Sequence, residues 1–408
     1  MRNNQKYALN VGGILAILGL FVTLFGAPIS RATVSIGTAL FAGALIAWSI
    51  RSQWNLSVVS RRVILIVGVL VVITVVDHFR SPVEGKILYQ FILLLPLVLI
   101  APVVMNLRID HRMVRGVFFL VMLLFSIIAI WSSISYFLNH EEIDAMLLQS
   151  KHVPLVTRMH HIYFGLFLAA LSWVGIHYGM RSQSTMRYLF FGMSAAMIMA
   201  MHVLSSRTGL LGFYVSVGIY LFIFLGRGKS PRLKLRLITA AILLPLLSAL
   251  FIPSIRMKIE NTREDIASLS EGGEELNFKS FAMRTESWKA GWSAIEKDWL
   301  FGVGSGAFEG AVAKGYEEIE TPLFVENRIA PHNQFIDSWL RYGLLGMLIP
   351  LSLFVMPFFG RIRHRSDLFW PLWGLSLSSF MVESVLQRQL GVLWFAVFYF
   401  LFFVEKPK

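Results

Sequence analysis

The stretch HNQFIDSWLRYGLLG, from His332 to Gly346, places a histidine and an asparagine directly before an apolar segment that continues to about residue 360. A helix of about 20 mostly apolar residues is long enough to cross a bilayer. His332 and Asn333 would then lie at the membrane edge, where this helix begins. The rest of the chain must show on which side of the membrane that edge lies.

The chain as a whole is far more apolar than a soluble domain of its size. Its 408 residues are 56% hydrophobic and 15% charged, and the mean hydropathy is +0.65. We therefore predict an all-α polytopic membrane protein with about twelve transmembrane helices, at residues 7–25, 32–50, 63–79, 87–105, 116–137, 162–180, 187–204, 208–226, 236–253, 334–360, 368–383 and 389–404. No small-residue cleavage site follows the first stretch, so we expect it to be a retained helix.

The net charge of +13 follows the predicted topology rather than suggesting a nucleic-acid partner. If the helices alternate in direction, the short basic connections all fall on one side, and the positive-inside rule makes that side, with both termini, cytoplasmic. These connections contain Arg51, Arg61, Arg62, Arg108, Arg112, Arg115, Arg181, Arg187, Arg227, Lys229, Arg232, Lys234, Arg236, Arg361, Arg363, Arg365, Lys406 and Lys408.

Two segments on the opposite, outer side are too long to be turns. The shorter covers about 138–161 and the longer about 254–333, and long loops are usually functional. We expect nine transmembrane helices in 1–253, a large and mostly helical outer loop domain in 254–333, and three transmembrane helices in 334–408.

Inside the large loop, SFAMRTESWKAGWSAIEKDWL (280–300) predicts an amphipathic helix with Ser280 as its N-cap. Arg284 lies on the predicted apolar face, and it either snorkels to the membrane surface or points into an outer cavity to meet an anion. The other members of that face are Phe281, Trp288, Trp292, Ile295 and Trp299.

Four further features argue against a cofactor or a metal. Gly302-x-Gly304-x-Gly306 has no preceding strand and is interpreted as a tight turn. His140-Glu141-Glu142 does not continue to H-E-x-x-H, and the adjacent His160 and His161 are expected to point to different helix faces. The chain has no cysteine for a thiolate site. We expect neither a metal nor a cofactor.

The stretch LSSRTGLLGF (204–213) joins two apolar segments on the outer side. Ser205 or Ser206 can cap the second helix, and Arg207 lies in its first turn. Free backbone N–H groups, hydroxyls and a guanidinium at a helix start together form an anion site. The alternative is an arginine that only snorkels at the interface.

His332 also lies at an outer helix start. The positive end of the helix disfavours imidazolium, and a neutral imidazole is what a general base requires. Glu383 and Arg388, in the outer connection before the last helix, either pair with each other or orient the catalytic groups.

His332-Asn333, nine further residues and Gly343-Leu-Leu-Gly346 resemble the H-[NSQ]-x9-G-x-x-[GTY] pattern of O-antigen ligases. These enzymes share a superfamily with O-antigen polymerases and bacterial protein O-oligosaccharyltransferases. Arg207, within Ser206-Arg207-Thr208-Gly209, and Arg284 look like the two arginines that the family uses.

The resemblance implies a glycosyltransferase in the bacterial inner membrane with its active site facing the periplasm. It would transfer O-antigen polysaccharide from undecaprenyl pyrophosphate to lipid A–core, without metal and with inversion, in lipopolysaccharide biosynthesis. His332 would act as base, Arg207 and Arg284 would bind pyrophosphate, and Asn333, Glu383 and Arg388 would support them.

Other functions are expected to leave different sequence features. A polymerase would have two comparably long arginine-rich outer loops, whereas 138–161 is much shorter than 254–333. A protein O-oligosaccharyltransferase usually carries an extra domain after its last helix, whereas this sequence ends in FFVEKPK. A transporter of lipid-linked glycans would have charges near the bilayer midplane and an internal repeat.

The predicted topology can be tested with single cysteines, because the chain has none of its own. Ser270→Cys lies in the large loop and Ser230→Cys in a basic connection. In intact cells with a permeabilised outer membrane, an impermeant thiol reagent should label position 270 and leave position 230 unlabelled. Labelling at 230 with protection at 270 would reverse the topology.

Overall fold

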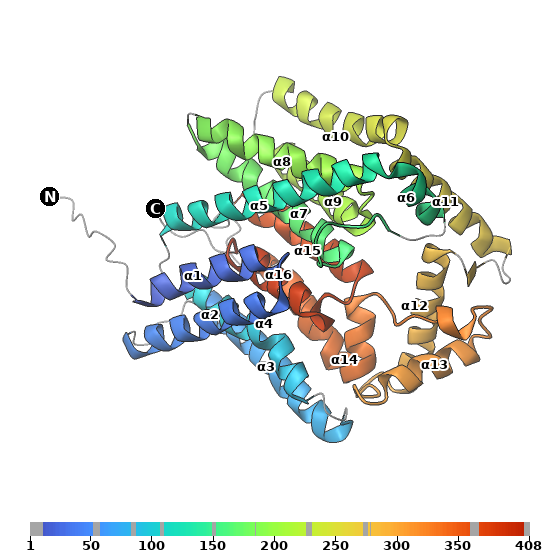
Figure 1. Ribbon diagram of the computed structural model, residues 1–408. Coiled ribbons are helices and arrows are strands. Elements are labelled where there is room, and N and C mark those ends of the chain that lie inside the picture. The colour runs from blue at the N-terminus through green and yellow to red at the C-terminus, as the bar shows by residue number, and fades with distance from the viewer. Residues whose placement is uncertain are drawn as a thin grey trace.

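The computed structural model describes residues 11–51, 58–82, 87–106, 110–148, 152–183, 185–225, 231–271, 276–277, 279–359 and 367–403. Within these ranges the chain is helical, with α-helices joined by short 3-10 turns and loops (Figure 1). The first ten α-helices are α1 (Val11–Gly26), α2 (Arg31–Arg51), α3 (Val58–Arg80), α4 (Ile87–Asn106), α5 (His111–Leu138), α6 (His140–Leu148), α7 (His161–Arg181), α8 (Thr185–Val203), α9 (Arg207–Leu225) and α10 (Pro231–Phe251).

Three helices then form the large loop, and three more complete the chain. The former are α11 (Pro253–Glu271), α12 (Ser280–Lys297) and α13 (Phe308–Glu318), and the latter are α14 (Gln334–Val355), α15 (Phe369–Val382) and α16 (Gln389–Phe400). Short 3-10 turns lie at η2 (Val325–Asn327), η3 (Met356–Phe358) and η5 (Val385–Gln387).

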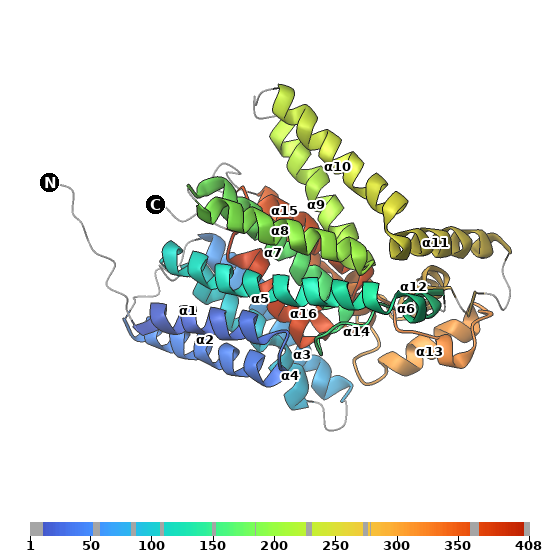
Figure 2. The same ribbon diagram turned by 45° about the horizontal axis from the view of Figure 1, so that its top comes forward.

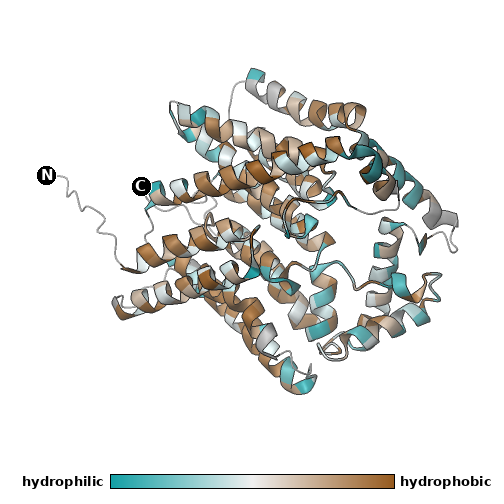
Figure 3. Ribbon diagram, viewed as in Figure 1, coloured by the Kyte–Doolittle hydropathy of each residue, from teal (hydrophilic) through white to brown (hydrophobic). Residues whose placement is uncertain are grey.

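The loop helices gather at one end of the bundle. Figures 1 and 2 show α6, α11, α12 and α13 together at this end, whereas α1, α5 and α8 begin at the opposite end. In Figure 3 the bundle helices are mostly hydrophobic, and hydrophilic residues concentrate on α6 and α11. The large loop is mostly helical, as the sequence predicts. We call the end of the molecule where α6, α11, α12 and α13 gather the loop end.

All twelve predicted apolar stretches form helices in the described ranges, and this arrangement fits an all-α polytopic membrane protein. Six helices there are long and apolar enough to cross a membrane, or seven if α10 and α11, bent by 94° where they meet, count as one span. Five others are apolar but shorter. Twelve transmembrane spans, and the division at residues 253 and 333, stay predictions.

Helix α12 is present, and its buried face coincides only in part with the predicted apolar face: Ile295 is buried, but the larger aromatic side chains are not. Small side chains face the neighbouring helices, whereas Phe281, Trp292 and Trp299 are between 42% and 51% exposed. The reason is close packing: a Cβ on Gly315 of α13 would lie 2.2 Å from the carbonyl oxygen of Ala290. Bulky aromatic residues cannot fit at such a contact.

The start of α12 also differs from the prediction. Ser280 is the first residue of the helix rather than its N-cap. The carboxylate of Asp265, on α11, accepts a hydrogen bond from the backbone N–H of Phe281 at 2.9 Å. An acidic side chain at this position satisfies a free N–H and complements the helix dipole.

The glycine-rich turn after α12 is a tight turn, as predicted, and it docks on α14. Gly302 and Gly304 have φ of 67° and 86°, and Val303 N–H donates to the Leu340 carbonyl at 2.8 Å. Gly343 breaks α14 at this contact, with φ 70° and ψ −163°. This backbone conformation is accessible essentially only to glycine.

The same contact explains why the Gly-Leu-Leu-Gly step begins with a glycine. A Cβ on Gly343 would lie 2.1 Å from the carbonyl oxygen of Leu300. Trp339, one turn earlier in α14, donates its indole N–H to the carbonyl of Trp299 at 2.8 Å. The first part of α14 is therefore bound to the loop end, and the break lets the second part run along the bundle.

We predict that Gly343→Ala lowers the free energy of unfolding by roughly 1–3 kcal/mol, from strained backbone plus the clash with Leu300. The measurement is the denaturation midpoint of the purified protein. Gly310→Ala on α13 is the control, because a Cβ there meets nothing within 4 Å. Equal midpoints for the two variants would contradict this account.

Candidate functional site

The predicted site residues meet where the start of α14 contacts the connection between α15 and α16. Residues 331–334 and 381–386 are joined by a series of side-chain hydrogen bonds, and we call these two segments the hinge pair. Ser384 Oγ donates to the Pro331 carbonyl at 3.0 Å, and the Gln334 side-chain oxygen accepts from Leu386 N–H at 2.6 Å. These hydrogen bonds join residues 53 and 52 positions apart in sequence, and so they hold the two segments in fixed register.

Asn333 ties both segments to the helix start. Its Oδ1 accepts from the backbone N–H groups of Phe335 at 2.9 Å and Ile336 at 3.2 Å, so it is the N-cap of α14. Its Nδ2 donates to the carbonyl of Met381 at 3.0 Å. An N-cap residue with this pattern fixes the helix entry, and here it also fixes the neighbouring segment.

His332 contacts a carboxylate across the hinge pair. Its Nδ1 lies 3.2 Å from Glu383 Oε1; the imidazole side chain is 34% exposed and that of Glu383 only 8%. A carboxylate at Nδ1 favours the tautomer with a proton there, which leaves Nε2 as an acceptor. The ring is thus oriented by a buried group and open to solvent on one side.

Arg284 reaches the same segment from α12. Its Nη1 donates to the carbonyl of Val382 at 3.1 Å, one residue before Glu383. Burial lowers the pKa of the Arg284 guanidinium, and the nearby Glu383 carboxylate opposes that change. Arg284 and His332 are therefore both held by residues 382–383.

Arg207 and Arg284 line one cavity of about 160 Å³, together with Lys258 of α11. The Nε and Nη2 atoms of Arg207 are buried without a hydrogen-bond partner among the described residues. Buried polar atoms are usually satisfied. A cavity with three cationic side chains and unpaired guanidinium nitrogens is suited to an anion with several oxygens.

Three histidines form a further wall of this region. His152 and His161 stack with ring centroids 4.0 Å apart, and His160 lies 4.4 Å from His161. Burial lowers the pKa of His160; Glu383 raises it, whereas His152, Arg388 and His332 lower it further. Burial lowers the pKa of His152 and His161 as well, so these imidazoles tend to be neutral. His152 and His161 line the arginine cavity, whereas His160 lies close enough to Glu383 and His332 to interact with their charges.

The histidine arrangement corrects the prediction that His160 and His161 point to different helix faces. His160 has extended backbone, with φ −62° and ψ 134°, and α7 begins only at His161. The helical spacing rule does not apply across a helix start, so the two rings can lie together. In the described ranges no group of three or more acidic or histidine side chains has metal-binding geometry.

The alternatives for Glu383 can now be distinguished. Glu383 pairs with His332 and not with Arg388, which is exposed and precedes α16 as its N-cap. The structure thus brings His332, Asn333, Glu383 and Arg284 to the hinge pair, and Arg207 to the adjoining cavity. Lys258 and the stacked histidines were missed by the sequence analysis, because no motif marks them.

The geometry allows a proton transfer beside an anion site. A neutral imidazole oriented by a carboxylate can take a proton from a hydroxyl, and adjacent guanidinium groups can stabilise negative charge that develops on a leaving group.

Part of this chain is similar to known proteins. A family model described as O-antigen ligase matches residues 192–351, a range that contains Arg207, Arg284 and His332. The match supports membership of the O-antigen ligase-like superfamily. An uncharacterized protein of Haemophilus influenzae is 25% identical over 195 residues, which cover 47% of this chain and 47% of the relative. The chain thus spans about half the length of that curated relative.

We predict that Arg207→Lys and Arg284→Lys each weaken binding of inorganic pyrophosphate by roughly tenfold, because lysine keeps the charge but loses the planar fork that matches two oxygens. Isothermal titration of the purified protein measures this. Arg256→Lys is the control, since Arg256 is exposed and donates to the Leu250 carbonyl outside the cavity. Unchanged affinity in both test variants would reduce these arginines to structural anchors.

Proposed function

We propose that this chain, whose residues 192–351 match the O-antigen ligase family, is an O-antigen ligase. It transfers O-antigen polysaccharide from undecaprenyl pyrophosphate to a sugar hydroxyl of lipid A–core. The reaction takes place at the periplasmic face of the bacterial inner membrane, and it needs neither metal nor cofactor. The observation that carries the proposal is the cationic cavity beside the His332–Glu383 pair.

The proposed reaction is a single displacement at the anomeric carbon. The acceptor hydroxyl oxygen forms a bond to that carbon while the bond from the carbon to the pyrophosphate oxygen breaks. The hydroxyl proton passes to Nε2 of His332, and undecaprenyl pyrophosphate leaves as an anion. Attack from the face opposite the leaving group inverts the anomeric configuration.

The two arginines act on the leaving group. Negative charge grows on the pyrophosphate oxygens as the glycosidic bond breaks, and preorganised cations stabilise that charge. Two guanidinium groups supply the positive charge that Mg²⁺ provides in other enzymes, and they add paired hydrogen-bond donors. This is the physical basis for proposing a metal-independent enzyme.

Glu383 positions the base rather than touching the substrate. Its hydrogen bond to Nδ1 holds Nε2 toward the acceptor and stabilises the imidazolium that forms when the proton is taken up. Asn333 and Gln334 keep Glu383 in place through the hinge pair. Arg388, exposed at the start of α16, is proposed to support substrate binding from the rim.

The proposal is tested by incubating purified protein with lipid-linked O-antigen and lipid A–core, and resolving the products on gels. Ligated lipopolysaccharide should form, and the reaction should proceed equally in the presence of EDTA. Loss of activity in EDTA that Mg²⁺ restores would refute metal independence. Longer glycan still attached to undecaprenyl pyrophosphate would indicate a polymerase, and glycosylated protein would indicate a protein O-oligosaccharyltransferase.

We predict that His332→Ala lowers the ligation rate by about 10² to 10⁴, the usual contribution of a general base. The ligation rate of Glu383→Gln should lie between those of His332→Ala and wild type, because glutamine keeps the shape of the glutamate side chain but loses its charge. Both should bind inorganic pyrophosphate normally. His140→Ala on α6, an exposed histidine outside the site, is the control. Ligation by His332→Ala within a few-fold of wild type would leave His332 without a chemical role.

A further inference from the structure

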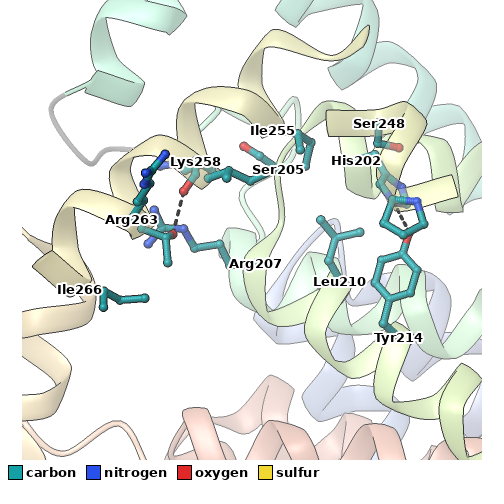
Figure 4. Close-up of a pocket in the computed structure, with 13 residues that line it drawn as sticks. His202, Ser205, Arg207, Leu210, Tyr214, Ser248, Ile255, Lys258, Arg263 and Ile266 are labelled. Carbon is teal, nitrogen blue, oxygen red and sulfur yellow. Dashed lines mark hydrogen bonds between the residues drawn. The ribbon is translucent and has the colours of Figure 1, made fainter. Parts of the chain in front are cut away.

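A second, larger cavity lies directly beside the arginine cavity. It has a volume of about 540 Å³ and is enclosed by the end of α8, α9, α10 and α11 (Figure 4). Its surface is mainly apolar, and it is partly open. Its volume is within the range of about 300–1,000 Å³ that is usual for small-molecule sites.

The two cavities share part of their lining. Ser205, Arg207 and Lys258 border both of them. Ser205, in the tight turn between α8 and α9, has φ 43°, which is unusual for a residue other than glycine. The turn thus directs Arg207 to the junction between a cationic cavity and an apolar one.

The residues of the large cavity are arranged by polarity. Figure 4 shows Arg207, Lys258 and Arg263 at one end, Leu210 and Ile255 in the middle, and His202 with Tyr214 at the other end. His202 Nε2 lies 2.6 Å from Tyr214 Oη, and His202 Nδ1 lies 2.8 Å from the Ile198 carbonyl. The polar atoms at the far end therefore satisfy each other.

The wall formed by α11 is fixed to the rest of the fold. After the 94° bend from α10, Ser254 donates to the Val203 carbonyl at 2.7 Å and so pins the start of α11 to the end of α8. Asn261 donates to the Leu147 carbonyl of α6 at 3.1 Å. Lys258 lies between these two anchors, so its backbone is held beside Arg207.

We propose that Lys258 is a third cation for the donor pyrophosphate, and that the apolar cavity binds the isoprenoid units nearest to that pyrophosphate. This inference rests on the proposed function. A ligand with an anionic head and a long apolar tail matches a cationic cavity that opens into an apolar one. The phosphate nearer to the tail lies at Lys258, and the phosphate nearer to the sugar lies at Arg284.

The surroundings of the cavity suit a tail that continues into the bilayer. The outer surface of α10 exposes Ile242, Leu246 and Leu250, with exposed fractions between 54% and 62%. Figure 2 shows α10 standing away from the main bundle beside α9. A lipid chain that leaves the cavity would therefore pass between apolar helices and not through the polar loop end.

The test measures equilibrium binding of undecaprenyl pyrophosphate and of inorganic pyrophosphate to the purified full chain by native mass spectrometry. Lys258→Met should weaken the binding of both ligands by about tenfold, because each loses one charged contact. Leu210→Trp should fill the apolar cavity, weaken undecaprenyl pyrophosphate by about tenfold, and leave inorganic pyrophosphate unchanged.

Each variant has a neighbour as its control. Arg256→Met removes an exposed cation of α11 that does not line either cavity, and Leu211→Trp places the same large ring on the outer side of α9, where Leu211 is 45% exposed. Lys258→Met that binds inorganic pyrophosphate as well as Arg256→Met overturns the role of Lys258. The proposed tail site is overturned if Leu210→Trp binds undecaprenyl pyrophosphate as tightly as Leu211→Trp does. It is also overturned if Leu210→Trp weakens the binding of both ligands equally.

The outcomes separate this inference from the proposed function. Wild-type protein that shows the predicted binding pattern but transfers no glycan to lipid A–core would refute the ligase function and leave the two cavities as a lipid pyrophosphate site. Ligation at wild-type KM for the donor by both Lys258→Met and Leu210→Trp would overturn the inference and leave the ligase function standing.

Discussion

The hinge pair is the contact on which the whole site depends. Residues 331–334 and 381–386 come from different helices, and hydrogen bonds of Asn333, Gln334 and Ser384 hold them together. Each bond contributes about 0.5–1.5 kcal/mol net, but a buried group left without its partner costs more. The segments therefore stay in register, and only in this register do His332 and Arg284 meet at residues 382–383.

The second constraint is electrostatic. Arg207, Lys258 and Arg284 line one small cavity, where they repel each other and lose hydration. Glu383 offsets part of this cost near Arg284, and Asp265 does so near Arg207. An arriving anion would offset the remainder, so the charge of this cavity favours an anionic ligand. The imidazoles of His152 and His161 line the same cavity without adding a permanent charge.

Sequence patterns predicted much of this architecture, and the failures have physical causes. The apolar stretches were correctly predicted to be helices because hydropathy alone marks such segments. Gly302 and Gly304 correctly indicated a tight turn. The apolar face predicted for α12 matches its buried face only at Ile295, because most helix contacts here are made by small residues, which the periodicity of large residues does not reveal. The topology and the twelve spans are still untested.

Within the site, motif residues were found and supporting residues were not. His332 and Arg207 stand at helix starts, where the dipole and free N–H groups give them a recognisable setting. Arg284 was found by its place on the predicted apolar face of α12. Lys258 lies inside a polar helix, and only the bend between α10 and α11 brings it to the cavity. The pairing of Glu383 with His332 depends on a contact 51 residues apart in sequence, which no local pattern indicates.

The break at Gly343 changes where one should divide this protein. Residues 334–342 look like part of a bundle helix, but their hydrogen bonds lead to the turn at 299–304 and to the hinge pair. Mechanically they belong to the loop end. A chimera that exchanges the large loop between two homologues should therefore be joined at Gly343 and not at residue 333. It should also carry residues 381–386 from the same parent, so that Arg284, His332 and Glu383 are inherited as one unit.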